Sequence, residues 1–96
     1  MLFHATHRHT HATCPSHNPE KRALFNKVLN SASELGVKVV GSYSDAPGHT
    51  LFYILEADTA LQIAQFFNPI LELGDTEIKP VTDTIELLEQ MAGQEK

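Results

Sequence analysis

Residues 37–55 read VKVVGSYSDAPGHTLFYIL, which is two runs of strand-forming residues separated by a turn. The first run, residues 37–43, is short and rich in β-branched side chains, which favour strands. The residues at 45–48, Asp-Ala-Pro-Gly, are typical of a turn. The second run, residues 50–55, is apolar at almost every position, as in a central strand that is covered on both faces. These residues therefore predict a β-hairpin with a central second strand.

A helix is predicted immediately before this hairpin. Asn18, Pro19 and Glu20 form a start signal, with an N-cap, a proline at the first helical position and an acid in the first turn. Apolar residues then recur at helical spacing and form one stripe, at Leu24, Val28, Ala32 and Leu35. Gly36 is placed to end the helix in a left-handed conformation.

A second helix is predicted after the hairpin, with Asp58 as its cap and an inner face of Leu61, Ala64 and Phe67. Asn68-Pro69 must interrupt it, because proline removes a helical hydrogen bond and clashes with the preceding turn. We expect a short helical turn from there to Gly74.

The chain is predicted to end in an edge strand and a helix. Residues 76–81 favour a strand, and Pro80 restricts that strand to the edge of the sheet, since it cannot donate to a ladder. Residues 83–86 resemble a capping box for a terminal helix. The apolar residues of that helix are Ile85, Leu88 and Met91.

At the other end of the chain, residues 2–8 alternate and contain neither glycine nor proline, which predicts a first strand. One face of this strand would carry Phe3, Ala5, His7 and His9, and the other Leu2, His4, Thr6 and Arg8. The predicted fold is therefore α+β: a ferredoxin-like βαββαβ domain over residues 1–96, with an antiparallel sheet and a C-terminal helix.

Such a sheet has helices on one face only. Either Phe52 and Ile54 or Tyr53 and Leu55 must then lie on the uncovered face. Because a bare apolar sheet face is normally buried against a partner, we expect a homodimer that closes into an α+β barrel.

The same region resembles a family of small, largely uncharacterised prokaryotic domains with the dimeric α+β barrel fold. The resemblance rests on Gly-Val-Lys-Val-Val-Gly-Ser-Tyr at 36–43, on Gly-His-Thr-Leu-Phe-Tyr-Ile-Leu-Glu-Ala-Asp at 48–58 and on Ile-Lys-Pro-Val at 78–81. It covers about residues 37–82, and its motifs are structural. It implies the fold and the dimer, and it implies no activity.

Composition limits the possible partners. The formal net charge is −5, and lysine and arginine form no cluster, so we expect no nucleic-acid partner. We expect no membrane partner either, because no apolar run approaches the roughly 18–20 residues that span a bilayer. We expect a cytoplasmic location, because the N-terminus lacks the features of a signal peptide.

Histidine and cysteine dominate the chemistry between residues 4 and 17. Two His-x-His pairs, at 7/9 and 9/11, put imidazoles on one face of an extended chain, with Cα atoms about 6.5–7 Å apart. The only cysteine, Cys14, and His17 follow in a loop over residues 9–17. Imidazole and thiolate favour Zn, Fe, Ni or Cu. The predicted ligands of a divalent transition-metal ion are His7, His9, His11, Cys14 and His17, with His4 on the wrong face of the strand.

Three residues are candidates for catalysis. Cys14 is a candidate nucleophile, with His11 or His17 as its base. Glu56 ends the central strand, which we expect to run parallel to the first strand and so to bring this carboxylate near the histidines. Arg8 is a candidate for binding an anionic substrate. His49 is expected on the surface of the hairpin turn, outside the site.

Three functions remain open from the sequence. The first is a small metal-dependent enzyme, acting on a small molecule at an ion with an open coordination position. The second is a non-catalytic metal-binding or sensing module. The third is an assembly domain whose histidines are incidental. Three protein ligands favour the first function, and four favour the second.

Overall fold

The hairpin forms as the sequence predicts. In the computed structural model, which describes residues 1–94, β2 spans Lys38–Asp45 and β3 spans Thr50–Glu56. With β1 (Leu2–His9) and β4 (Gly74–Val81) they form one sheet in the order β2-β3-β1-β4. The central position of β3 and the edge position of β4, which contains Pro80, are both confirmed.

Every pair of neighbouring strands is antiparallel. β1 runs against β3, so that Leu2 lies opposite Glu56 and Arg8 lies opposite Thr50. The expectation that these two strands run parallel was wrong. The helix between β1 and β2 makes those two strands parallel, and the hairpin then reverses the chain, so that β3 must oppose β1.

Helix α1 spans Pro19–Asn30, and Asn18 caps it as predicted by accepting a hydrogen bond from the Lys21 amide at 3.0 Å. The helix is shorter than its apolar stripe implied. A 3-10 turn, Ser33–Leu35, follows it, and Gly36 ends that turn at a left-handed φ of 72°. Leu24 is 37% exposed, whereas its neighbour Phe25 packs against the core. Val28 and Ala32 are buried and Leu35 packs against the core, as predicted, so the apolar stripe differs only at its first residue.

Helix α2 spans Ala60–Phe67 and ends at the break predicted for Asn68-Pro69. A 3-10 segment, Asn68–Leu73, follows it. Its cap is Thr59 rather than Asp58, because the Thr59 hydroxyl accepts the Gln62 amide. Leu61, which was predicted to face inward, is 67% exposed. The residues that α2 buries are Ile63, Phe66 and Phe67.

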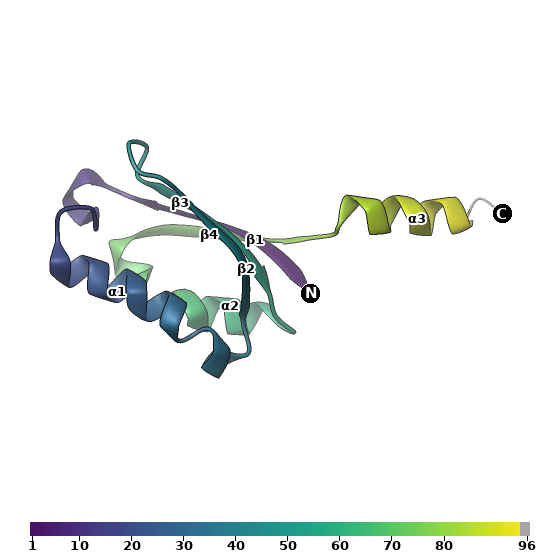
Figure 1. The fold of residues 1–96 in the computed structure, drawn as a ribbon, viewed down its shortest axis with the longest axis horizontal. Coiled ribbons are helices and arrows are strands. Elements are labelled where there is room, and N and C mark those ends of the chain that lie inside the picture. Colours follow the sequence, from purple (N-terminus) through teal and green to yellow (C-terminus); the bar gives the residue numbers. More distant parts are fainter. Residues whose placement is uncertain (95–96) are drawn as a thin grey trace.

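Both of these helices cover the same face of the sheet (Figure 1). Tyr53 and Leu55 are on this covered face, so Phe52 and Ile54 are on the open one. The ring of Tyr53 meets those of Phe66 and Phe67 at centroid distances of 6.2 and 5.1 Å. Burial raises the pKa of Tyr53 to about 12, so its phenol stays neutral in this core. The ferredoxin-like α+β fold is confirmed.

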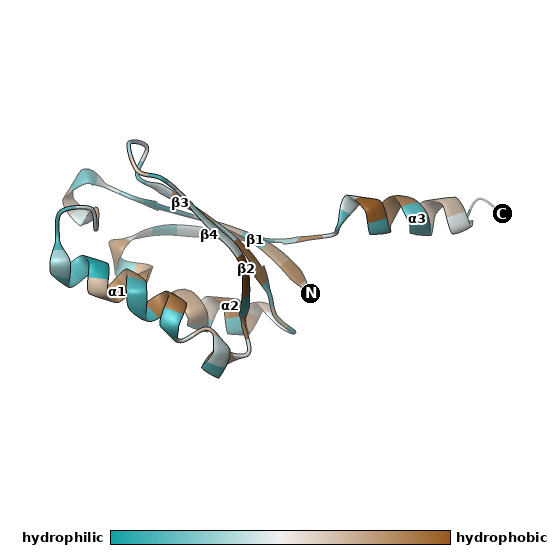
Figure 2. Ribbon diagram, viewed as in Figure 1, coloured by the Kyte–Doolittle hydropathy of each residue, from teal (hydrophilic) through white to brown (hydrophobic). Residues whose placement is uncertain are grey.

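Helix α3, Thr84–Gln94, projects away from the sheet and contacts neither α1 nor α2 (Figure 1). Asp83 caps it by accepting the amides of Ile85 and Glu86. Its apolar residues show as brown bands on a helix that stands apart from the rest of the molecule (Figure 2). Ile85, Leu88 and Met91 are 69%, 58% and 50% exposed.

Among the helices of residues 1–94, none combines the length and the apolar character that crossing a membrane requires.

Candidate metal centre

Strand β1 places two histidines under the helices. The alternation of the strand buries His7 and His9, which are 0% and 9% exposed, on the same face as Phe3 and Ala5. His4 lies on the open face, as its position in the alternation predicted. The covered face at this end of the sheet therefore carries two imidazoles where hydrophobic side chains would be expected.

The hairpin turn brings a third imidazole to the same place. Because β3 starts where β1 ends, His49 lies beside His9. The His9 amide donates to the His49 carbonyl at 3.0 Å, and their ring centroids are 5.3 Å apart. His49 has a positive φ of 52°, which is strained for a residue other than glycine. The turn thus directs this side chain toward the end of β1.

The loop after β1 adds a thiol. A 3-10 turn, His11–Thr13, reverses the chain, and Cys14 follows directly. One donor atom from each of His9, Cys14 and His49 then lies within 4.8 Å of the other two. Atoms at this separation can share one ion after small movements, because metal–ligand bonds of about 2.0–2.3 Å put ligand atoms roughly 3.3–3.8 Å apart around a tetrahedral ion.

Helix α1 holds this loop in place. The Lys21 ammonium donates to the Ala12 carbonyl at 2.8 Å, and the Arg22 guanidinium donates to the Ser16 carbonyl at 3.0 Å. The two bonds hold the chain on either side of Cys14. The position of the thiol therefore depends on the first turn of α1.

Three imidazole nitrogens in this region are buried and have no hydrogen-bond partner within the described residues: Nε2 of His7 and Nδ1 of His9 and His49. A buried polar atom without a partner costs about 1–3 kcal/mol. Two of the three nitrogens belong to His9 and His49, the residues that cluster with Cys14. A metal ion bound through Nδ1 of His9 and His49 would satisfy two nitrogens that no group among residues 1–94 satisfies.

His7 lies deeper than the cluster and is not part of it. Its Nδ1 shares a hydrogen bond of 2.9 Å with Thr76 Oγ1 on β4. Burial, together with repulsion from His9, lowers the pKa of His7 to about 4, so its ring is neutral near pH 7. Phe25 packs edge-on against the rings of both His7 and His9, at 5.5 and 5.9 Å. His7 and Phe25 thus pack against the ring of His9 on its buried side.

The Cys14 thiol and the His9 imidazole favour the protonation states that bind metal. Burial lowers the pKa of His9, with a smaller contribution from His49, which keeps its ring neutral. The Cys14 thiol lies 3.2 Å from Ser16 Oγ, and hydrogen bonding to the side chain and backbone of Ser16 lowers its pKa. Neutral imidazole and thiolate are the forms that coordinate an ion.

A cavity of about 550 Å³ opens beside the cluster. Cys14 and His49 line it, and so do His11 and His17. The His11 ring is 6.3 Å from that of His49. Of the five ligands predicted from the sequence, the structure therefore brings His9 and Cys14 together. It places His11 and His17 at the cavity wall and His7 behind the cluster.

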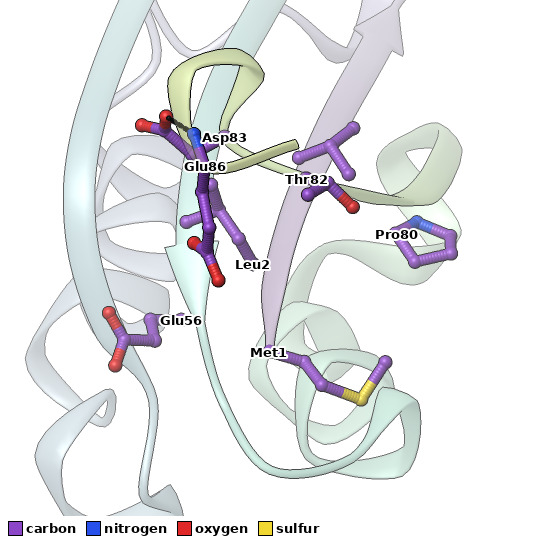
Figure 3. A pocket seen from close by; sticks show the side chains of 8 residues that line it. Met1, Leu2, Glu56, Pro80, Thr82, Asp83 and Glu86 are labelled. Carbon is purple, nitrogen blue, oxygen red and sulfur yellow. Dashed lines mark hydrogen bonds between the residues drawn. The ribbon is translucent and has the colours of Figure 1, made fainter. Parts of the chain in front are cut away.

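Two of the catalytic candidates lie away from this cavity. Arg8 is exposed on the open face of the sheet. Glu56 lies opposite Leu2 at the far end of β3, where it lines a separate cavity of about 690 Å³ with Asp83 and Glu86 (Figure 3). The expectation that Glu56 approaches the histidines was wrong, because β3 runs antiparallel to β1.

His49 is the residue that the sequence reasoning missed. It was expected at the surface, but its Nδ1 is buried and it belongs to the cluster. The antiparallel direction of β1 and β3 follows from the β-α-β-β order, and it brings the hairpin turn to the end of β1. That signal was present in the sequence.

Residues 1–95 match the family described as "Domain of unknown function (DUF3303)". No curated protein matches the chain. Among solved structures, the chain is similar to the crystal structure of protein Atu4242 from Agrobacterium tumefaciens, a structural genomics target. The two are 14% identical, the match covers 88% of this chain and 96% of that one, and the TM-score is 0.45.

Proposed function

The chain belongs to the DUF3303 family, and from its own residues we propose that it binds a divalent transition-metal ion through His9, Cys14 and His49. The observation that carries the proposal is the convergence of three donor residues, two of which hold a buried imidazole nitrogen without a hydrogen-bond partner among residues 1–94. A purely structural role for these histidines leaves both nitrogens unsatisfied. An ion satisfies them and also holds the loop against the hairpin.

The donor set selects the kind of ion. Two imidazoles and one thiolate suit Zn, Fe, Ni or Cu, whereas Ca and Mg require oxygen ligands. A thiolate ligand also fits the reducing cytoplasm, where free cysteines persist. We infer a cytoplasmic protein with a resident first-row ion.

Three ligands beside a cavity favour a small metal-dependent enzyme. Catalytic zinc sites keep three protein ligands and leave a fourth position for water or substrate. Here Cys14 and His49 line a cavity of about 550 Å³, which is large enough for a small molecule. The inferred role of the ion is to activate water or to polarise a small substrate at that open position.

A non-catalytic metal-binding or sensing module is the second candidate, and one observation favours it. His11 lies close to His49, with ring centroids 6.3 Å apart, and it belongs to the loop that already supplies Cys14. A small movement of this loop would add a fourth ligand and close the coordination shell. Ligand number therefore separates the two candidates.

We also propose a homodimer. The open face of the sheet exposes Tyr43, Phe52 and Val81, at 65%, 38% and 38%. Helix α3 exposes its own apolar stripe and carries Glu86 and Glu89 without a basic residue between 84 and 94. An isolated helix of this length is marginal in water. A twofold pair, in which each α3 packs against the sheet of the other copy, would bury both surfaces at once.

Metal analysis of protein made without an affinity tag or a nickel column tests the metal proposal. After dialysis against trace amounts of Zn, Fe, Ni and Cu salts, we expect one ion per chain by plasma mass spectrometry. Substoichiometric metal would reject the proposal and leave an assembly domain with incidental histidines.

A further inference from the structure

The cavity beside the cluster opens onto two of the residues that would hold the proposed ion. Two of the three donor residues, Cys14 and His49, line this cavity, whereas His9 approaches from the sheet behind them. A vacant coordination position on a shared ion would therefore face the cavity. Its volume of about 550 Å³ is within the roughly 300–1,000 Å³ range of small-molecule sites.

The lining of this cavity favours an anion. In the part of the chain that the structure describes, no Asp or Glu lines it, although the chain carries 12 acidic residues against 7 basic ones. The cavity at the other end of the sheet is lined by Glu56, Asp83 and Glu86 (Figure 3). The acid of the neighbouring hairpin, Asp45, accepts a hydrogen bond from the Gly48 amide at 3.1 Å and is not part of the lining.

Two cations of helix α1 are bonded to the wall of the same cavity. The side chains of Lys21 and Arg22 are fixed on the backbone of Ala12 and Ser16, two residues of its wall. One thiolate neutralises only half the charge of a divalent ion, and neutral imidazoles neutralise none. The loaded site would therefore keep a net charge of +1, with imidazole donors of His11 and His17 beside it.

The wall also has an apolar part, beside the polar residues Ser16 and Asn18. Ala12, Ala46 and Pro47 line the cavity together with the polar residues. Such a surface contacts carbon and leaves inorganic anions without a partner. The lining therefore combines an anion-binding end at the ion with a surface for a short hydrocarbon body.

We propose that this cavity binds a small organic carboxylate, which occupies the fourth coordination position of the ion while His11 and His17 donate hydrogen bonds to it. The inference rests on the proposed metal site. It adds to that site the chemical class of the ligand: a carboxylate with a short apolar body that lies against Ala46 and Pro47.

Cobalt(II) loading separates the two claims. A thiolate-to-cobalt charge-transfer band reports ion binding at Cys14, and the ligand-field bands report the fourth ligand. We expect acetate and butyrate to change the ligand-field bands without removing the charge-transfer band. Butyrate should bind about tenfold more tightly than acetate, because each buried methylene contributes roughly a threefold to fourfold gain. Inorganic phosphate serves as the control anion without a hydrocarbon body, and it should bind no better than acetate.

Two variants give the matched test. His17→Ala should weaken butyrate about tenfold, the loss of one hydrogen bond to a charged group, and leave the charge-transfer band intact. His4→Ala, which removes an imidazole from the open face of the sheet, should change neither.

Each remaining outcome overturns one of the claims. A protein with no charge-transfer band overturns the metal site and this inference together. A normal band with ligand-field bands that ignore both carboxylates overturns this inference alone. Phosphate binding as tight as that of butyrate overturns the claim that the cavity selects an organic carboxylate.

Discussion

The amide of His9 donates a 3.0 Å hydrogen bond to the carbonyl of His49, and their imidazole rings lie 5.3 Å apart. The bond joins the last residue of β1 to the turn before β3, although the two residues are 40 positions apart in the sequence. Backbone pairing therefore holds the two imidazoles side by side, whereas Cys14 comes from the loop after β1.

Removing either imidazole should abolish metal binding. We predict less than one tenth of an ion per chain in His9→Ala and in His49→Ala, because each variant leaves only two of the three donors. His4→Ala should keep full occupancy, since His4 lies on the opposite face of the sheet. Plasma mass spectrometry after dialysis checks all three variants. Full occupancy in His49→Ala would return His49 to the surface role that the sequence first indicated.

The metal-free protein should lose stability in acid, and His7 should be a major cause. Its pKa falls from 6.5 in the unfolded chain to about 4 in the fold, so the unfolded chain binds more protons between these values. The contribution of neutral His7 to the free energy of unfolding is fully present above about pH 6.5. It is lost as the pH falls toward 4, which lowers the free energy of unfolding by about 3 kcal/mol.

Urea unfolding at pH 7 and at pH 4.5 measures this loss, with His7→Phe as the comparison. The variant keeps a ring in the buried position and removes the titrating group. Its free energy of unfolding should depend less on pH, and the remaining dependence should include His9, whose pKa is also lowered by burial. An identical pH dependence in both proteins would contradict the assignment to His7.

Cys14 should react slowly when metal is bound and quickly when it is removed. A coordinated thiolate is unavailable to iodoacetamide, so we predict at least a tenfold faster alkylation after chelation. In the metal-free protein, Ser16→Ala should slow the reaction at pH 7, because Ser16 lowers the pKa of this thiol. Equal rates with and without metal would remove Cys14 from the ligand set.

The dimer depends on the open sheet face and on α3. Light scattering of the unmodified protein should give twice the 10.6 kDa chain mass. Phe52→Lys and Leu88→Lys, which place a charge on the two proposed contact surfaces, should give monomers. Leu61→Lys is the matched control, because Leu61 is equally apolar and 67% exposed but lies on α2. A monomeric unmodified protein, or a monomeric Leu61→Lys variant, would contradict the proposed interface.

Much of the fold could be predicted because its signals are local. Asn18-Pro19 starts a helix and Asn68-Pro69 interrupts one, through steric and hydrogen-bonding effects that need no knowledge of the rest of the chain. Local signals did not predict which of two neighbours on α1 faces the core: Phe25 does so in the structure, whereas Leu24 was predicted to. One residue is a rotation of about 100° around a helix, and only packing against the sheet selects between such neighbours.

The site was harder to predict because its ligands come from separate elements. Alternation along β1 correctly grouped His7 with His9, but it could not show that His7 is the deeper of the two, bonded to Thr76 on β4. The assumed direction of β3 brought in Glu56 and left out His49. With the antiparallel direction, the end of β3 that meets the histidines is the one that carries His49.

X-ray absorption at the metal edge of the zinc-loaded protein tests the central claim most directly. The ion bound by His9, Cys14 and His49 should show one sulfur at about 2.3 Å and two imidazole nitrogens at about 2.0–2.1 Å, together with one further light atom from water or a carboxylate. A first shell of nitrogen and oxygen without sulfur, or one with more than two imidazoles, would contradict this ligand set.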